Sequence, residues 1–201
     1  IRRALALSID REAIVKGVVK GGERPATTLT PPDTRGYTAT SDLGFNPEEA
    51  QRLLAEAGYP KGKGFPPLRL SFNTNEGHQK IAVAIQSMWK ANLNVDIQLQ
   101  NQEWKVYLNT MRLKDYGIAR YGWSGDYVDP NTFLDLYVTG GGNNDTGWGN
   151  DRYDEIVQKL APKASTQEER YKLLREAESI LLDEVPIIPI YFYYWNRLVR
   201  P

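Results

Sequence analysis

The alternation of strand-like and helix-like patterns in the middle of the sequence constrains the fold most strongly. Leu68, Leu70 and Phe72 alternate with other residues as in a half-buried strand. The apolar residues of the next segment recur at helical spacing instead. Parallel strands require long crossovers, so the pattern predicts an α/β domain with a mixed sheet and flanking helices. The expected elements are a strand over 68–72, a helix over 77–91, a strand over 95–100, a helix over 102–113 and a strand over 116–123.

Further helices are expected on both sides of this region. Asp10 and Asn46 each precede apolar residues at helical spacing and are typical N-caps. Asn46 is followed by Pro47 and two glutamates, which strengthens the prediction of a helix start. The other expected elements are helices over 1–9, 131–138, 151–160 and 166–184, a glycine-rich loop over 140–145 and a strand over 186–195.

Composition and charge exclude several classes of function. Lys plus Arg and Asp plus Glu both number 25, so the chain lacks the cationic excess of a nucleic-acid-binding surface. There are no cysteines, and His78 is the only histidine. Thiol catalysis, disulfides and metal sites built from Cys or several His are therefore excluded, and we expect no cofactor and no metal. No apolar run approaches the roughly 20 residues that a membrane span needs.

The segment from Tyr121 to Asp126 carries the strongest functional signal. Two aromatic residues surround Gly122 at the end of the third expected strand, and Asp126 follows in a turn. A glycine at a free strand edge lets another backbone approach closely, and an extended peptide can pair with such an edge. The carboxylate of Asp126 is suited to a terminal ammonium group. The same residues also fit an ordinary turn beside a buried aromatic core, and the pattern alone leaves both interpretations open.

Several motifs in a fixed order carry a resemblance to a known family. The chain resembles the C-terminal lobe of the oligopeptide- and dipeptide-binding proteins, family 5 of the bacterial extracellular solute-binding proteins, which serve peptide ABC importers. The matching stretches are Ile1-Arg2-Arg3-Ala4-Leu5 with Ile9-Asp10-Arg11, Thr30-Pro31-Pro32, residues 50–59, Asn101-Gln102-Glu103-Trp104, Gly122-Trp123-Ser124-Gly125-Asp126 and residues 185–191.

This resemblance implies a binding protein and not an enzyme. Residues 1–201 are expected to form a single domain, one lobe of a type II periplasmic-binding-protein-like architecture whose N-terminal lobe is absent from this sequence. The implied partners are an oligopeptide ligand, that N-terminal lobe and the membrane permease of an ABC transporter. The implied location is the periplasm or the extracellular space, with a membrane tether in a Gram-positive source.

The resemblance also implies roles for individual residues. Asp126 is expected to pair with the amino terminus of the bound peptide. The preceding strand is expected to pair with the peptide main chain, and other side chains are expected to line pockets for the peptide's side chains. The main-chain group consists of Tyr121, Gly122, Trp123 and Ser124, and the pocket group consists of His78, Trp104 and Tyr193.

The sequence departs from the family pattern at one place, and it leaves several alternative functions open. Related oligopeptide binders carry an Arg-His pair where this sequence has Met111-Arg112, so a ligand preference set there is in doubt. Relatives of the same fold bind nickel complexes or sugars. A glycoside hydrolase could use Asp126 and Asp129 as its acid and base. An interaction module is also compatible, and it predicts an exposed apolar patch near residues 1–5 and 195–201.

Overall fold

The computed structural model describes residues 1–194, and a small parallel sheet organises its first half. Strand β2 (Leu68–Asn73) lies between β3 (Ile97–Gln102) and β4 (Ile118–Ala119), and both pairs are parallel. Helix α4 (Glu76–Leu93) connects β2 to β3, and α5 (Trp104–Leu113) connects β3 to β4. The strand–helix order predicted from the alternating pattern is therefore confirmed.

Helix α4 is fixed by a capped start and one buried stripe. The side-chain oxygen of Asn75 accepts a hydrogen bond from the backbone N–H of His78 at 3.2 Å, which satisfies a free donor of the first turn. Trp89 is fully buried, and its indole N–H donates to the carbonyl oxygen of Leu5 at 2.9 Å. Asn94 ends the helix in the left-handed conformation, which Asn tolerates better than most residues.

The segment before the sheet contains three short helices, and the second and third begin at their predicted caps, Asp10 and Asn46. They are α1 (Arg2–Leu7), α2 (Arg11–Ile14) and α3 (Pro47–Glu56). The side chain of Asp10 accepts from Ala13 N at 2.9 Å, and that of Asn46 accepts from Glu49 N at 3.0 Å. Single π or 3-10 turns occupy η1 (Val15–Val19), η2 (Pro60–Gly62), η3 (Asp135–Tyr137), η4 (Ile156–Leu160) and η5 (Ala161–Lys163).

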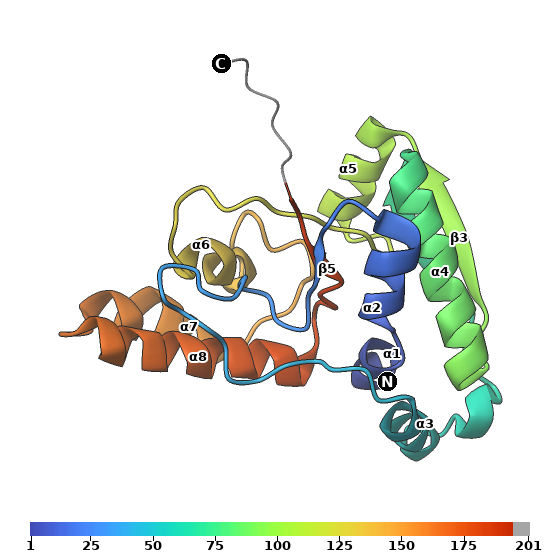
Figure 1. Ribbon diagram of the computed structural model, residues 1–201, viewed down its shortest axis with the longest axis horizontal. Helices are drawn as coiled ribbons and strands as arrows, with labels where there is room; N and C mark the ends of the chain where they lie inside the picture. Colours follow the sequence, from blue (N-terminus) through green and yellow to red (C-terminus); the bar gives the residue numbers. More distant parts are fainter. Residues whose placement is uncertain (195–201) are drawn as a thin grey trace.

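The molecule has two halves (Figure 1), and each half contains a hydrophobic core. The first, here called the sheet-side core, joins α1 to α4 with the sheet. The second, the helix-side core, is built on α6 (Asn131–Leu134), α7 (Asp151–Glu155) and α8 (Gln167–Glu184). Sheet-side residues include Leu5, Ile9, Phe72, Ile85 and Trp89, helix-side residues include Tyr37, Leu134, Tyr153, Leu174 and Leu181, and a small third cluster of Ala6, Leu43, Leu182 and Val185 joins the halves.

The strand predicted over residues 186–195 is largely wrong. Only β5 (Tyr191–Phe192) pairs, antiparallel to β1 (Arg24–Pro25), and residue 195 lies outside the described residues. Pro186 and Pro189 lack the N–H that a ladder needs, so the first part of the segment cannot pair regularly. Residues 185–194 instead form a strap that runs along the junction of the two halves, where Figure 1 places β5.

The strand predicted over residues 116–123 is also shorter than expected. Its paired part is β4, followed by one more bond from Arg120 N to the carbonyl oxygen of Ser71 at 2.8 Å. Beyond Arg120 the chain leaves the sheet. The glycine pattern there marks an unpaired backbone and not a longer strand.

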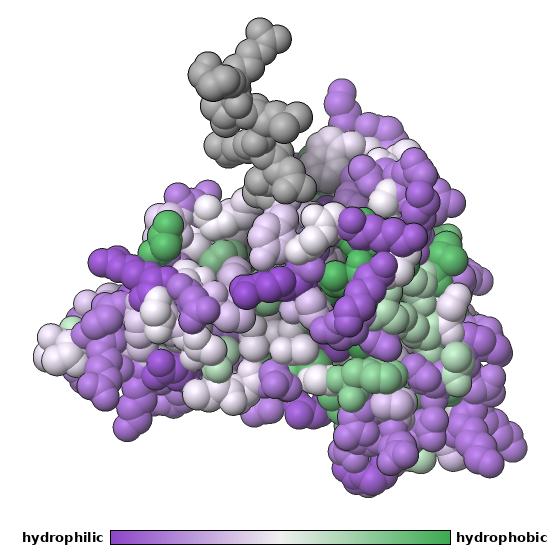
Figure 2. Space-filling model, viewed as in Figure 1, coloured by the Kyte–Doolittle hydropathy of each residue, from purple (hydrophilic) through white to green (hydrophobic). Residues whose placement is uncertain are grey.

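The surface in view is mostly hydrophilic, with apolar side chains in small groups (Figure 2). Near the amino terminus Ile1 is 48% exposed, whereas Ala4 and Leu5 are buried. The apolar patch predicted for an interaction module is therefore limited to one side chain at residues 1–5, and its other part at 195–201 lies outside the described residues. Among the described helices, none combines the length and the hydropathy needed to span a membrane.

Candidate functional site

Three of the predicted site residues follow directly after the three parallel strands. His78 lies in the first turn of α4 after β2, Trp104 begins α5 after β3, and Tyr121 follows β4. The carboxyl ends of parallel strands meet at one edge of the sheet, and ligands of open α/β sheets bind outside that edge. The topology therefore gathers at one edge residues that are widely separated in the sequence.

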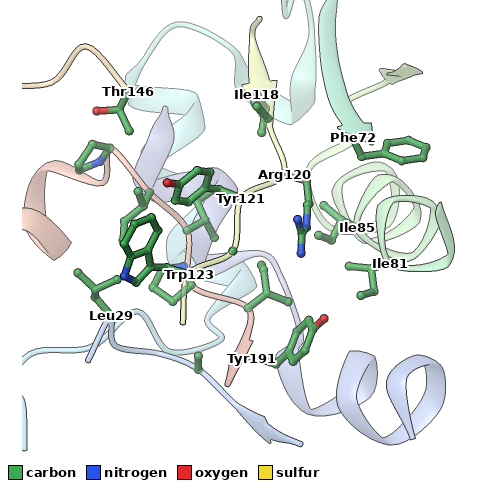
Figure 3. Close-up of a pocket in the computed structure, with 18 of the residues that line it drawn as sticks. Leu29, Phe72, Ile81, Ile85, Ile118, Arg120, Tyr121, Trp123, Thr146 and Tyr191 are labelled. Atoms are coloured by element: carbon green, nitrogen blue, oxygen red, sulfur yellow. The ribbon is translucent and has the colours of Figure 1, made fainter. Parts of the chain in front are cut away.

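A cleft of about 740 Å³ opens at this edge, between the two hydrophobic cores. Figure 3 shows Tyr121 and Trp123 on one side, near Leu29, with Ile81 and Ile85 of α4 on the other. The strap of residues 185–194 forms a third wall. Of the predicted site residues, the cleft brings together His78, Tyr121, Gly122, Trp123, Ser124 and Tyr193.

The backbone of residues 121–124 is free along this cleft. In the described part of the chain, no hydrogen bond uses the backbone N–H or C=O of Tyr121, Gly122, Trp123 or Ser124. All four residues are exposed or half-buried, so these groups are available to a partner. An unpaired backbone beside a sheet edge is the feature that an added peptide strand requires.

The ring of Tyr193 lies against Gly122. A methyl group placed on Gly122 would lie 3.1 Å from the Tyr193 ring and 3.0 Å from the Arg120 guanidinium. The Tyr193 hydroxyl and that guanidinium also form a hydrogen bond. Only glycine fits this approach without displacing one of the two neighbours.

Asp126 is exposed, and its carboxylate has no ion-pair partner among residues 1–194. Its backbone N–H donates to the Thr132 hydroxyl at 3.0 Å, which fixes the turn but leaves the carboxylate open. Burial raises the pKa of the nearby Asp135 carboxyl, and the negative charge of Asp126 raises it further, while a hydrogen bond from Tyr127 acts in the opposite direction. Asp126 itself does not line the cleft: it follows Gly125, which does, and its open carboxylate lies next to that lining residue in the chain.

Asp129 differs completely from Asp126, although the two are three residues apart. Asp129 is buried, and both of its carboxylate oxygens accept hydrogen bonds from Arg170, at 2.6 and 2.9 Å. Burial alone would raise its pKa, but the bonds from Arg170 and from Asn131 N–H hold it below its usual value. A carboxylate already neutralised in this way is not available as the second carboxyl group of a glycoside hydrolase. Asp126 and Asp129 therefore do not form the acid–base pair that this alternative requires.

Arg120 is a cleft residue that the sequence reasoning missed. Figure 3 shows its guanidinium pointing toward Ile81 and Ile85, away from Tyr121 and Trp123. His78 lies close enough for the Arg120 charge to act on it: burial lowers the pKa of His78 and the guanidinium lowers it further, while a hydrogen bond with the backbone of Asn73 acts in the opposite direction. A lone arginine one residue after a short strand carries no signal in a single sequence.

A second hollow of about 260 Å³ adjoins the cleft beside α5. Trp104, 49% exposed, stacks near Tyr107 and lines this hollow together with Leu108. Met111 and Arg112, the two positions that depart from the family pattern, line it as well. Trp104 therefore lies in this adjoining hollow and not in the main cleft, and the hollow has the size and the walls of a pocket for one side chain.

Comparison with known proteins places this geometry in a family. The family model described as bacterial extracellular solute-binding proteins, family 5 Middle, matches residues 1–145. The chain is 42% identical over 201 residues to the oligopeptide-binding protein OppA of Bacillus subtilis, covering 96% of this chain and 37% of the relative. It is 40% identical over 210 residues to the periplasmic murein peptide-binding protein MppA of Escherichia coli, covering 100% of this chain and 38% of the relative.

Solved structures agree with this assignment. The structure of the Escherichia coli murein tripeptide binding protein MppA has a TM-score of 0.88 and 39% identity, over 96% of this chain and 38% of that one. Haemophilus influenzae OppA in complex with the peptide RPPGFSPFR has a TM-score of 0.84 and 36% identity, over 96% and 39%. The chain thus spans less than two fifths of the length of these relatives.

These comparisons confirm the resemblance and the α/β fold. The roles predicted for individual residues stay predictions. The chain belongs to family 5 of the bacterial extracellular solute-binding proteins.

Proposed function

We propose that residues 1–201 form one lobe of a two-lobed peptide-binding protein, which holds an extended peptide in the cleft at the sheet's carboxyl edge. One observation carries the proposal: two groups without hydrogen-bond or ion-pair partners in the described residues lie next to each other in the chain. They are the backbone of residues 121–124 and the exposed carboxylate of Asp126. The relatives named for binding oligopeptides or murein peptides support the same class of ligand.

Main-chain pairing explains how one site accepts many peptides. Every peptide offers the same pattern of N–H and C=O groups, so affinity does not depend on its side chains. Gly122 lets the Tyr193 ring lie directly beside this backbone, and the walls formed by Tyr121, Trp123 and Tyr193 contribute apolar area. Trp104 and His78 lie where side chains of such a peptide would project, in the hollow beside α5 and along α4.

The carboxylate of Asp126 fixes the direction of the peptide. A terminal ammonium can donate to it in a charge-assisted hydrogen bond, which is stronger than a bond between neutral groups. Covering the cleft with a second lobe lowers the local dielectric constant and strengthens this pair. The peptide would therefore bind with its amino terminus at the turn of residues 126–132.

The proposed protein works outside the cytoplasm with an ABC importer. Its relatives are named as periplasmic, and the family as extracellular. The closed complex would deliver its peptide to a membrane permease, and in a Gram-positive source a tether would hold it at the membrane.

The ammonium pair is tested by blocking it from either side. In a full-length protein that contains this lobe, we expect N-acetylation of a peptide to weaken binding about 10- to 100-fold, the equivalent of one charged hydrogen bond. Asp126→Asn should weaken binding of the free-amine peptide by a similar factor and leave the affinity for the acetylated peptide almost unchanged. Isothermal titration calorimetry of the four combinations measures this. Equal affinities for the two peptides in the wild type would refute the assignment of Asp126.

Main-chain pairing is tested at Gly122. We expect Gly122→Ala to weaken peptide binding about fivefold, since the added methyl group displaces Arg120 or Tyr193 and disturbs roughly one hydrogen bond. Gly17→Ala is the matched control, because a methyl group there meets no atom within 4 Å and Gly17 lines neither the cleft nor the hollow. Affinities measured by calorimetry and melting temperatures should separate the two variants. An unchanged affinity in Gly122→Ala would count against a role for this backbone segment and its neighbours Arg120 and Tyr193 in holding the peptide.

A further inference from the structure

The turn that carries Asp126 is attached to a distant helix by a buried ion pair. Arg170 lies in the first half of α8, and its guanidinium contacts both carboxylate oxygens of Asp129 with a fork of two hydrogen bonds, at 2.6 and 2.9 Å. The Asp129 side chain is 10% exposed and that of Arg170 is 22% exposed. A paired fork of this kind fixes orientation as well as distance, which a single contact does not.

Further bonds connect this ion pair to the backbone around Asp126. The oxygen of Asp129 that accepts the shorter Arg170 bond also accepts the N–H of Asn131 at 3.0 Å. The Asp129 N–H donates to the carbonyl oxygen of Tyr127, and the Asp126 N–H donates to the Thr132 hydroxyl, both at 3.0 Å. The turn is thus fixed at its middle by α8 and at its start by α6.

The packing of Gly125 leaves the turn little freedom on the other side. A methyl group at Gly125 would approach Thr132 to 2.9 Å and the Phe133 ring to 3.1 Å. The backbone before Asp126 therefore rests directly on α6. In contrast, the Asp126 carboxylate itself has no partner in the described residues, so its position depends on the backbone of the turn.

The charges favour a purely positioning role for the pair. Arg35 is the only other cation found near Asp129 in the described residues; it lies 4.0 Å away and is 67% exposed, so it contributes little. Asp129 and Arg170 neutralise each other and leave the ammonium site to Asp126. Removing Arg170 would leave a buried, unpaired carboxylate, which relaxes by moving toward water and takes the turn with it.

We infer that Asp129 and Arg170 form a positioning pair that holds Asp126 where it can meet the amino terminus of the ligand. The inference rests on the proposed function of Asp126. It assigns two residues that do not contact the ligand to the specificity for a free amine.

The test compares the affinities for acetylated and free-amine versions of one peptide in the full-length protein. The ratio compared is the dissociation constant of the acetylated peptide divided by that of the free-amine peptide. In Arg170→Met, we expect this ratio to fall fivefold or more, while the affinity for the acetylated peptide changes less than twofold. Arg170→Lys keeps the charge without the fork, is expected to fold like the wild type, and should lower the ratio about two- to threefold. A merely structural role would weaken both peptides equally and leave the ratio unchanged.

Arg152→Met is the matched control. Arg152 also pairs with α8, through Glu176 at 2.8 Å, but its ion pairs are half exposed and distant in sequence from the turn. Its ratio should equal that of the wild type. If the ratio falls to about one in Asp126→Asn but stays at the wild-type value in both Arg170 variants, only the role of the positioning pair is refuted. If Asp126→Asn leaves the ratio unchanged, both the pairing of Asp126 with the ammonium group and the role of the positioning pair are refuted.

Discussion

Replacing Glu178 with alanine is expected to lower the free energy of unfolding by about 3–5 kcal/mol, because several buried donors lose their acceptor at once. The Glu178 side chain in α8 is fully buried. One of its oxygens accepts the N–H groups of Leu29 and Thr30, both at 2.9 Å, and the other accepts the Tyr37 hydroxyl at 2.7 Å. These bonds hold the loop that carries Leu29 against Trp123 in the cleft.

Glu178→Gln separates hydrogen bonding from charge. Its carbonyl oxygen can still accept both N–H groups, and its amide can donate to the Tyr37 hydroxyl. We expect it to cost less than about 1.5 kcal/mol. Urea denaturation of the lobe, followed by tryptophan fluorescence, measures both variants. A loss below 1 kcal/mol in the alanine variant would show that this network contributes little.

The pH dependence of stability gives an independent check on Glu178. Burial is the main cause that raises the pKa of this carboxyl, and the hydrogen bonds it accepts only partly oppose it. A group whose pKa is higher in the folded than in the unfolded state stabilises the fold fully below the unfolded value, about 4.3, and this contribution is lost as the pH rises through the folded value. The wild type should lose this contribution between those limits, and Glu178→Gln should not.

The second large effect concerns ligand affinity of the lobe by itself. We expect residues 1–201 to fold alone and yet to bind tri- to pentapeptides about 1,000-fold more weakly than the two-lobed protein. If ligand contacts divide evenly between the lobes, a micromolar site worth about −8 kcal/mol falls to about −4 kcal/mol, which is millimolar. In the open cleft, the ammonium pair of Asp126 also falls to the roughly 0–1 kcal/mol of a surface ion pair.

Calorimetry of both forms with the same peptides checks this expectation. Circular dichroism and one cooperative thermal transition first establish that the lobe is folded, so that weak binding reflects the open cleft. An affinity in the micromolar range for residues 1–201 alone would contradict the idea that the peptide is shared between two lobes.

The sequence predicted the helices and the parallel order well, because caps and periodic apolar residues are local signals. The predicted caps Asp10 and Asn46 act as caps in the structure. The lengths of β4 and β5 were wrong, since apolar, aromatic-rich segments resemble strands whether or not a neighbour is available to pair with them.

The site was predictable only in part, for a different reason. Asp126 and Asp129 look alike in the sequence, and only the distant Arg170 distinguishes an open carboxylate from a neutralised one. Arg120 and Glu178 gave no signal, because their roles depend on contacts with segments far away in the chain. Residues that act through long-range partners need the fold before they can be recognised.

The placement of His78, Trp104 and Tyr121 after three adjacent strands has a consequence for how such proteins diversify. Each of these residues is supplied by its own short connection, while the strands beneath them are tied together by the ladder. If these residues contact the ligand as proposed, a substitution in one connection changes what the lobe recognises and leaves the scaffold intact. An ancestral lobe of this design can thus give rise to descendants with a new ligand through a few substitutions at one edge of the sheet.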